Sequence, residues 1–283
     1  MKVQQLMQEF DKCYITERLK PTTANGYRVN IRCHILPYIA ETPIEKINLK
    51  TLEELTDTLR AKGLSNKTIV YVHATLRKAL NFAIRRRNIN WNPYELYDLP
   101  KVETYKYKTL NPLQIQILLE GVKGKEIEPY VRLAVCYGLR RGEILGISPD
   151  DYDTEHGILH IQRTRTAVNG QPVITTCKTK KSNRYILVAK EDEPYILGKS
   201  FEWSPTHLDT EFKKVLKSND LPKEIRFHDL RHSYATWMLT QEVNPKIVSE
   251  VLGHSSVKVT LDIYSHANTS MQRVCHAAMG KLS

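Results

Sequence analysis

Residues 227–237 read FHDLRHSYATW, a segment that predicts a helix with His228 and Arg231 on one face, since they stand at positions i and i+3. The planar fork of an arginine suits the grip of a phosphate group. His228 and His232, at i and i+4, could instead suggest a zinc pair. A metalloprotease helix needs Glu directly after its first His, but Asp229 stands there and no third ligand is evident, so we do not expect zinc.

Downstream, residues 252–266 read LGHSSVKVTLDIYSH. A helix opened by Asn244-Pro245 would end with Gly253 at its C-cap position, and His254 follows it. Taken alone, His254 could be no more than a charge at a helix C-terminus. Tyr264, ten residues further on, could equally be an ordinary core tyrosine.

Upstream, residues 137–147 read YGLRRGEILGI. Gly138 would end one helix, and Arg140 stands where the next begins. Arg140 could simply cap backbone carbonyls. Glu143 at i+3 could hold the guanidinium of Arg140 in place, as a preorganised phosphate ligand requires.

Residues 177–186 read CKTKKSNRYI, a run that contains Lys178, Lys180, Lys181 and Arg184. Such a run is usually a solvated hairpin. Lys178 differs by position, because it would end the strand that follows a predicted Asn169-Gly170 hairpin turn. The choice among the three lysines stays open at this point.

Together these segments contain donors suited to oxyanions and one candidate oxygen nucleophile, with no acidic residue in the set that could hold a metal. Such a set fits a phosphate that is bound and attacked by a side chain, with protein cations in the place of a metal ion. We therefore expect neither a metal nor another cofactor. The set is Arg140, Lys178, His228, Arg231, His254 and Tyr264.

The order and spacing of these residues resemble the tyrosine recombinase (phage integrase) family, above all its integrases from phages and conjugative transposons of low-GC Gram-positive bacteria. Gly-Leu-Arg-x-x-Glu, His-x-Leu-Arg-His and Gly-His followed by Tyr match three boxes of that family. The resemblance implies attack by Tyr264, acid or base assistance from His228 and a phosphate clamp by Arg231. It also implies phosphate binding by Arg140 and His254. Lys178 would protonate the departing 5′ oxygen, since Lys-Thr-x-x-Ser-x-Arg matches from there.

The resemblance also implies a function and partners. The chain would integrate or excise a mobile element through a 3′-phosphotyrosyl intermediate, as a homotetramer on two DNA duplexes with core or att-type sites, with possible accessory DNA-bending or excision factors. Three alternatives stay open: a Xer-like resolvase, a DNA-binding regulator that keeps the fold, and a type IB topoisomerase.

Composition agrees with this interpretation. The chain has 283 residues, enough for two domains, and a net charge of +11 that favours a polyanionic partner. Its hydrophobic content of 41% excludes a disordered tail protein. No apolar run approaches the ~20 residues of a membrane span. The five cysteines are odd in number and never form C-x-x-C, so we expect reduced thiols in a cytoplasmic protein.

Residues 1–98 show only helix patterns, with no strand pattern. We predict that they form the core-type DNA-binding domain that the resemblance implies. The most regular helix has Ser65 or Asn66 as its cap and ends in Arg85, Arg86 and Arg87, which we assign to DNA backbone contact. Lys180 and Lys181 receive the same assignment. Residues 99–109 alternate lysines with tyrosines and predict a linker.

Residues 110–283 should form a catalytic domain of helices around one small three-stranded antiparallel sheet. The predicted strands are 157–168, 171–177 and 184–188. The fold class is therefore α+β and mainly helical. In the tail, residues 270–283 show an apolar stripe at helical spacing, which predicts docking on a neighbouring protomer or, with equal support, on its own domain.

Overall fold

The computed structural model describes residues 1–103, 107–176 and 180–264, with only the backbone described for Lys180, Ile263 and Tyr264. Two compact units divide the chain, Met1–Tyr105 and Lys106–Ser283. The division falls inside the predicted linker, 99–109. Within the described ranges, no helix is long and apolar enough to cross a membrane.

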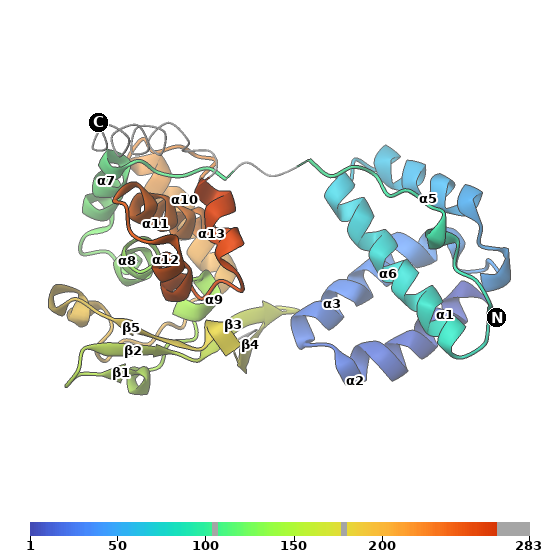
Figure 1. Cartoon of the computed structure of the whole chain (residues 1–283), viewed down its shortest axis with the longest axis horizontal. Helices are drawn as coiled ribbons and strands as arrows, with labels where there is room; N and C mark the ends of the chain where they lie inside the picture. The colour runs from blue at the N-terminus through green and yellow to red at the C-terminus, as the bar shows by residue number, and fades with distance from the viewer. Residues whose placement is uncertain (104–106, 177–179, 265–283) are drawn as a thin grey trace, which may run out of the picture. The chain divides into compact units, whose positions relative to one another are not determined.

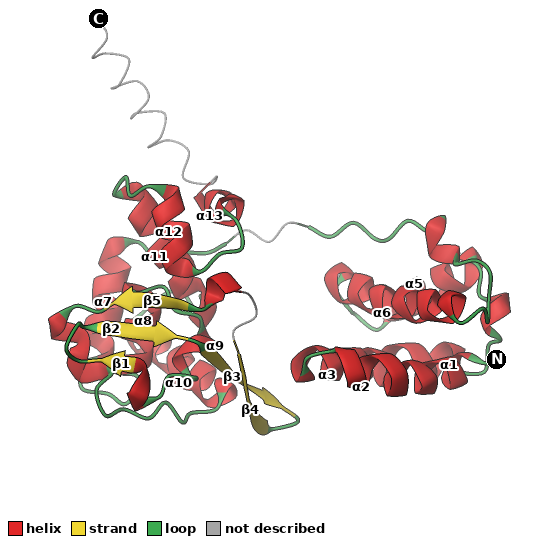
Figure 2. Ribbon diagram, turned by 60° about the horizontal axis from the view of Figure 1, so that its bottom comes forward, coloured by secondary structure: helices red, strands yellow, loops and turns green. Residues whose placement is uncertain are grey.

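Two long helical rods form one layer of the first unit (Figure 2). The first rod joins α1 (Val3–Phe10), a π-helical turn η1 (Asp11–Ile15) and α2 (Thr16–Arg18). The second joins α3 (Pro21–Asn30), a π-helical turn η2 (Ile31–Ile35) and α4 (Leu36–Ile39). The first rod has no start signal in the sequence, because its N-cap is Lys2.

Helices α5 (Leu49–Ala61) and α6 (Asn66–Arg85) form the second layer of this unit (Figure 2). Each begins at a side-chain cap: Asn48 accepts a hydrogen bond from the backbone of Thr51, and Ser65 accepts one from Thr68. Ser65 is therefore the cap of α6. Short 3-10 turns lie at η3 (Ile44–Lys46) and η4 (Pro93–Glu95).

A buried polar network joins these helices to the end of the unit. His73 of α6 is fully buried, with Nε2 2.8 Å from the hydroxyl of Thr56 in α5 and Nδ1 2.6 Å from the hydroxyl of Tyr94. Thr56 also lies 2.6 Å from the hydroxyl of Tyr97. Burial lowers the pKa of His73 to about 4. The segment that leads out of the first unit is thus held to its core by hydrogen bonds.

The second unit is mainly helical, and its helices lie to one side of a three-stranded sheet (Figures 1 and 2). The helices are α7 (Pro112–Val122), α8 (Glu128–Cys136), α9 (Arg141–Ile144), α10 (Pro205–Ser218), α11 (Phe227–Thr240), α12 (Pro245–Leu252) and α13 (Val257–Tyr264). Short 3-10 turns are η5 (Pro149–Asp151), η6 (Lys180–Ser182) and η7 (Lys190–Tyr195). Buried Leu133, Leu159, Phe212 and Leu230 bring α8, the sheet, α10 and α11 into one core.

The three-stranded sheet is antiparallel, with the order β1 (Tyr152–Asp153), β2 (Ile158–Ile161) and β5 (Arg184–Leu187). A separate two-stranded ribbon joins β3 (Arg163–Val168) to β4 (Gln171–Thr176). Asn169 and Gly170 form its turn with φ of 51° and 79°, the backbone of the predicted two-residue hairpin.

The prediction that one sheet contains strands 157–168, 171–177 and 184–188 was wrong. The first of these strands breaks at Gln162, whose side-chain amide donates to Asp151 at 2.7 Å, and the guanidinium of Arg163 donates to the same carboxylate. After the break, the backbone of β3 packs on α9 and on the turn that follows it, where a Cβ on Gly146 would lie 2.9 Å from the carbonyl oxygen of Arg163. The third strand of the sheet is instead β1, too short for an alternating pattern.

Candidate active site

Arg140 is the N-cap residue of α9, directly after a chain reversal at Gly138. Gly138 has φ +65°, and a Cβ there would lie 2.4 Å from a methyl group of Leu252, so the turn requires glycine. Glu143 accepts from the backbone N–H of Arg140 at 2.9 Å and from its Nη1 at 2.5 Å. This carboxylate therefore fixes the guanidinium of Arg140, as the spacing predicted.

Arg231 lies one turn into α11 and is only 2% exposed. Its Nη1 donates to the carbonyl oxygen of Gly138 at 2.8 Å, and its Nη2 donates to that of Leu252 at 2.6 Å. Burial, followed by the charge of Arg140, lowers the pKa of Arg231 to about 9. The guanidinium thus stays charged at pH 7, and the carbonyl dipole at the end of α12 favours that charge.

His254 follows the end of α12, where Gly253 has φ +64° and closes the helix as the predicted C-cap glycine. The ring is buried, and its Nδ1 lies 2.8 Å from the hydroxyl of Thr260 in α13. Burial, followed by the charges of Arg231 and Arg140, lowers the pKa of His254 to about 3. His254 is therefore neutral at pH 7 and is tied to the helix that ends at Tyr264.

His228 stands in the first turn of α11, with an exposed face. Desolvation, followed by the charge of Arg231, lowers its pKa below the usual value, so the ring can accept a proton at neutral pH. The ring of His232 lies 4.9 Å from that of His228, centroid to centroid, and packs 4.2 Å from the ring of Tyr107. Across the described ranges, no three His, Cys, Asp or Glu side chains gather as metal ligands.

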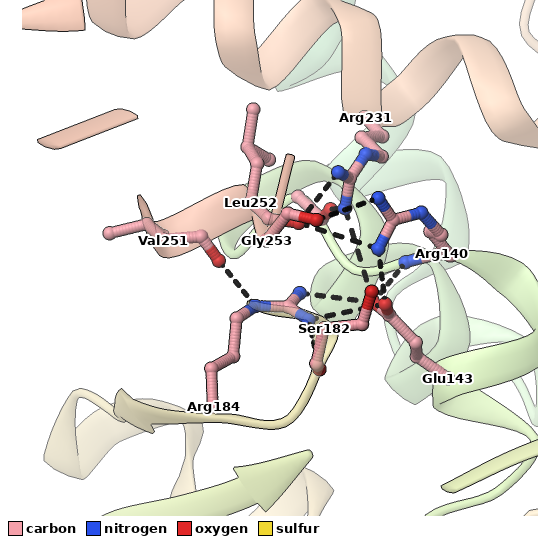
Figure 3. A network of polar contacts seen from close by, with 9 residues as sticks. Arg140, Glu143, Ser182, Arg184, Arg231, Val251, Leu252 and Gly253 are labelled. Carbon is pink, nitrogen blue, oxygen red and sulfur yellow. Dashed lines mark hydrogen bonds and ion pairs between the residues drawn. The ribbon is translucent and has the colours of Figure 1, made fainter. Parts of the chain in front are cut away.

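Three arginines meet one glutamate and three consecutive carbonyl groups at the end of α12 (Figure 3). The carbonyl of Val251 accepts from Nε of Arg184, that of Leu252 accepts from Arg231, and that of Gly253 accepts from Nη2 of Arg140 at 3.1 Å. Glu143 lies among the three guanidinium groups. Three positive charges and one negative charge leave a net charge of +2 in this cluster, which favours an anion.

A hollow of about 490 Å³ opens beside this cluster, between α9, α10 and α11. Arg140 and His228 both line it, so the structure brings these two predicted residues to one cavity. Its other polar lining residues are Arg141, Asp209, Lys213 and Arg226. The lining is predominantly basic, which suits a polyanion.

Comparison with known proteins identifies the family of this chain. A model of the phage integrase family matches residues 108–271, more than half of the chain, and a model of the phage integrase N-terminal SAM-like domain matches residues 2–59. The chain belongs to the phage integrase family. Its members are tyrosine recombinases, which cleave and rejoin DNA through a tyrosine intermediate.

Relatives of this recombinase include integrases and Xer proteins. The ICEBs1 integrase of Bacillus subtilis is 25% identical, over 90% of this chain and 76% of its own length. Tyrosine recombinase XerD of Staphylococcus haemolyticus is 26% identical, over 92% of both chains. Among solved structures, the Tn1549 transposon integrase in complex with transposon right end DNA has a TM-score of 0.81 and 23% identity, with 100% of this chain and 99% of that chain covered.

A lambda integrase tetramer bound to a Holliday junction is also similar, with a TM-score of 0.72, 18% identity, and 93% of this chain and 77% of that chain covered. Both structural likenesses confirm the predicted fold class of the recombinase, mainly helical with a small antiparallel sheet.

Of the other predicted site residues, Lys181 is described in full, and Lys180 and Tyr264 are described by their backbone. Lys178 lies outside the described residues, and the side chains of Lys180 and Tyr264 are not described. Lys181 donates from Nζ to the carbonyl oxygen of Ser255 at 3.0 Å, so η6 lies beside the turn that follows α12. Tyr264 is the last residue of α13.

In the first unit, the three arginines at the end of α6, Arg85, Arg86 and Arg87, have different environments. Arg86 forms an ion pair with Glu9 and packs over the ring of Phe82. Arg87 has φ +60° just beyond the end of α6. Arg85 and Arg86 line a hollow of about 260 Å³, whose other lining residues include Arg18 and Lys78. Arg86 is thus partly neutralised within its own unit.

Arg184 is a site residue that the sequence does not predict, because it belongs to the basic run 177–186 and begins the predicted strand 184–188. The strand gives the signal in retrospect. Arg184 and Ile186 alternate with exposed Tyr185 and Leu187, so Arg184 occupies the buried register of β5. A charged residue in a buried register requires a partner, and Glu143 supplies it.

Proposed function

We propose that this recombinase is a site-specific DNA integrase, which cuts and rejoins strands through a 3′-phosphotyrosyl bond to Tyr264 and so integrates or excises a mobile element. One observation carries the proposal. Arg140, Arg231 and His254 meet at the end of α12, and His254 is tied through Thr260 to the helix that ends in Tyr264.

The cations bind the scissile phosphate and stabilise the charge that develops on its non-bridging oxygens. Arg140 is suited to direct contact, because its side chain is 32% exposed while Glu143 fixes its orientation. Arg231 adds positive charge from the buried side, and neutral His254 supplies an Nε2–H donor when its Nδ1 accepts from the hydroxyl of Thr260. The loss of one such donor typically costs a factor of ~10²–10³ in rate.

Two proton transfers complete each strand cleavage. An ordinary tyrosine has a pKa of about 10, and the surrounding arginines favour its ionised form. His228, held neutral at pH 7, accepts the phenol proton, and Lys178 donates one to the departing 5′ oxygen. Because the phosphotyrosyl bond conserves the energy of the broken phosphodiester, religation by a 5′ hydroxyl needs no ATP.

The proposal extends to domains and partners. Residues 1–98 would be the core-type DNA-binding domain, with Arg85, Arg86 and Arg87 near the DNA backbone, and 110–283 the catalytic domain. The substrate is double-stranded DNA, and the active form is a homotetramer on two duplexes, assisted by accessory factors in the cytoplasm. The net charge of +11 and the similar lambda integrase tetramer on a Holliday junction support these partners.

A Xer-like resolvase is the second candidate, favoured by the similarity to XerD over 92% of both chains. The two functions share the chemistry and differ in the DNA that is recombined. Resolution joins two copies of one site, whereas integration joins an element end to a different target. Recombination assays with identical and with dissimilar site pairs separate them.

The test of the chemistry uses a pool of nicked duplexes randomised across the recognition region, with EDTA present. Cleavage beside the nick releases a short strand, so that the covalent adduct accumulates on SDS gels and its DNA can be sequenced. We expect adducts from the wild-type protein and none from Tyr264→Phe, with equal binding of the selected duplex by both. An adduct that persists in Tyr264→Phe would overturn the assignment of the nucleophile, and an adduct lost only in EDTA would overturn the metal-free chemistry.

A further inference from the structure

Arg184 is buried in the site cluster, yet it has no place in the chemistry proposed above. Its side chain is 7% exposed and its guanidinium donates in three directions. Nε donates to the carbonyl oxygen of Val251 at 2.5 Å, and Nη1 donates to that of Ser182 at 3.1 Å. Nη1 and Nη2 donate to the two carboxylate oxygens of Glu143 at 3.1 and 3.0 Å. Figure 3 shows the fork of Arg184 facing this carboxylate.

A buried arginine is costly to desolvate, so it is stable only when its N–H groups are paired with acceptors. Glu143 is 1% exposed and has the same need. Burial alone would raise its pKa, but the hydrogen bonds and charge of Arg184, followed by the charges of Arg140 and Arg231, lower it to about 2. Among these cations, Arg184 contributes most to keeping Glu143 ionised.

Glu143 has only two oxygens, and three guanidinium groups surround it. Arg184 takes both oxygens with a bidentate grip, and Arg140 shares Oε1. Arg231 stays 3.9 Å from Oε2, so its fork is directed to backbone carbonyls and not to the carboxylate. Without Arg184, Oε2 would keep only the backbone N–H of Arg140, and the carboxylate would draw Arg231, 3.9 Å away, from its two carbonyl partners.

We propose that Arg184 is a positioning residue that saturates Glu143 and anchors β5 to α12, so that Arg140 and Arg231 keep the positions from which they act on the scissile phosphate. This inference rests on the proposed recombinase chemistry, because it assumes that these two arginines bind the phosphate. With its side chain 7% exposed and paired with Glu143, Arg184 acts through its two neighbours and not on the phosphate itself.

The test compares Arg184→Gln with a matched control, Arg163→Gln, in the full-length chain. Arg163 pairs with Asp151, whose side chain is 2% exposed, so the control also removes an arginine from a buried carboxylate in the same unit. Both variants should lose thermal stability, which measures the merely structural effect. Both should bind the duplex selected by the wild-type protein, because most binding free energy comes from backbone phosphate contacts elsewhere.

Covalent adduct formation should separate the two variants. Misplacement of a catalytic group by about 1 Å costs ~10²-fold in rate, so Arg184→Gln should cleave about 10²-fold more slowly than the wild-type protein, and Arg163→Gln at nearly the wild-type rate. Arg184→Lys keeps the charge without the fork and should fall between them. If Arg184→Gln and Arg163→Gln cleave equally well, the inference is wrong while the recombinase chemistry stands. If the wild-type protein forms no adduct, the proposed function itself fails.

Two further readouts exclude an indirect effect. Loss of Arg184 should raise the pKa of Glu143, so cleavage by Arg184→Gln should decline with falling pH over a range where wild-type and Arg163→Gln are flat. A pH profile of Arg184→Gln parallel to wild type would contradict the proposal. A DNA substrate with sulfur at the bridging 5′ position should not rescue Arg184→Gln, since Arg140 and Arg231 act on non-bridging oxygens. Rescue would mean that Arg184 acts instead on protonation of the leaving group.

Discussion

At the scale of single residues, a bridging sulfur atom gives a direct test of Lys178. A 5′-thiolate has a pKa near ~8.5 and leaves without help, whereas an alkoxide needs a proton. Lys178→Ala should therefore cleave normal DNA far more slowly than wild type and the sulfur substrate at nearly the wild-type rate. Arg140→Ala and Arg231→Ala should stay defective on both.

Lys181 and Lys180 are the controls for that experiment. Lys181 already donates to the carbonyl oxygen of Ser255, so Lys181→Ala should show a modest defect on both substrates. We expect the same of Lys180→Ala. Selective rescue of either variant would move the general acid to that lysine, and rescue of none of the three would exclude these lysines as the proton donor.

Individual residues also show how far the sequence could be interpreted. Motif spacing, together with the family resemblance, selected Arg140, Glu143 and Arg231, and the structure brings these residues into one cluster. Spacing was not sufficient for Arg184, because its partnership with Glu143 spans 41 positions and depends on how β5 meets α9. A side chain 41 residues distant leaves no local pattern.

At the scale of elements, the contact between α13 and the turn after α12 can be tested with an isosteric change. Thr260→Val removes the hydroxyl that lies 2.8 Å from Nδ1 of His254 and keeps the buried shape. A lost hydrogen bond of about 1–1.5 kcal/mol corresponds to a roughly 5- to 10-fold slower adduct formation, with DNA binding unchanged. Single-turnover cleavage of the selected duplex measures it.

Thr210→Val is the control for this change, since its hydroxyl donates to a backbone carbonyl within the exposed part of α10. Equal cleavage rates for Thr260→Val and wild type would show that His254 keeps its place without this tether.

Elements also differed in how well the sequence predicted them. Helix caps were predictable, because Ser65, Asn244 and Gly253 act on the backbone within a few residues. The sheet was not, because the break at Gln162 depends on Asp151, eleven residues earlier in the chain and outside the strand. Alternation of apolar and polar residues continues through such a break unchanged.

At the scale of the whole molecule, buried histidines predict sensitivity to acid. An unfolded histidine takes up a proton below about pH 6.5, whereas folded His73 does so only near pH 4. Between these values the unfolded state binds more protons, so stability is complete above pH 6.5 and falls as the pH falls toward 4. The full difference is about 3 kcal/mol for this one residue.

Hydrogen exchange of α5 and α6 in the full chain measures this loss where His73 lies. Protection should decrease between pH 7 and pH 5, after correction for the intrinsic exchange rate. His73→Phe, although destabilised by the loss of its contacts to Thr56 and Tyr94, should show a shallower dependence on pH. An equally steep dependence in His73→Phe would assign the acid sensitivity to other groups.

Assembly is the second property of the whole molecule. The apolar stripe of residues 270–283, which lie outside the described ranges, predicts docking on a neighbouring protomer. Deletion of 270–283 should leave binding to a single site intact and weaken complexes on two sites in gel-shift titrations. Unchanged formation of both complexes would favour packing of the tail on its own domain.

The three carbonyl groups at the end of α12 have a consequence for how this molecule can change over generations. Their arginine partners grip the main chain, so the side chain of Val251 can vary while the cluster keeps its geometry. A one-residue insertion or deletion between Val251 and His254 would change the spacing between the three acceptors and misalign them with their arginine partners. The spacing of these residues is therefore a stricter requirement for the cluster than the identity of Val251.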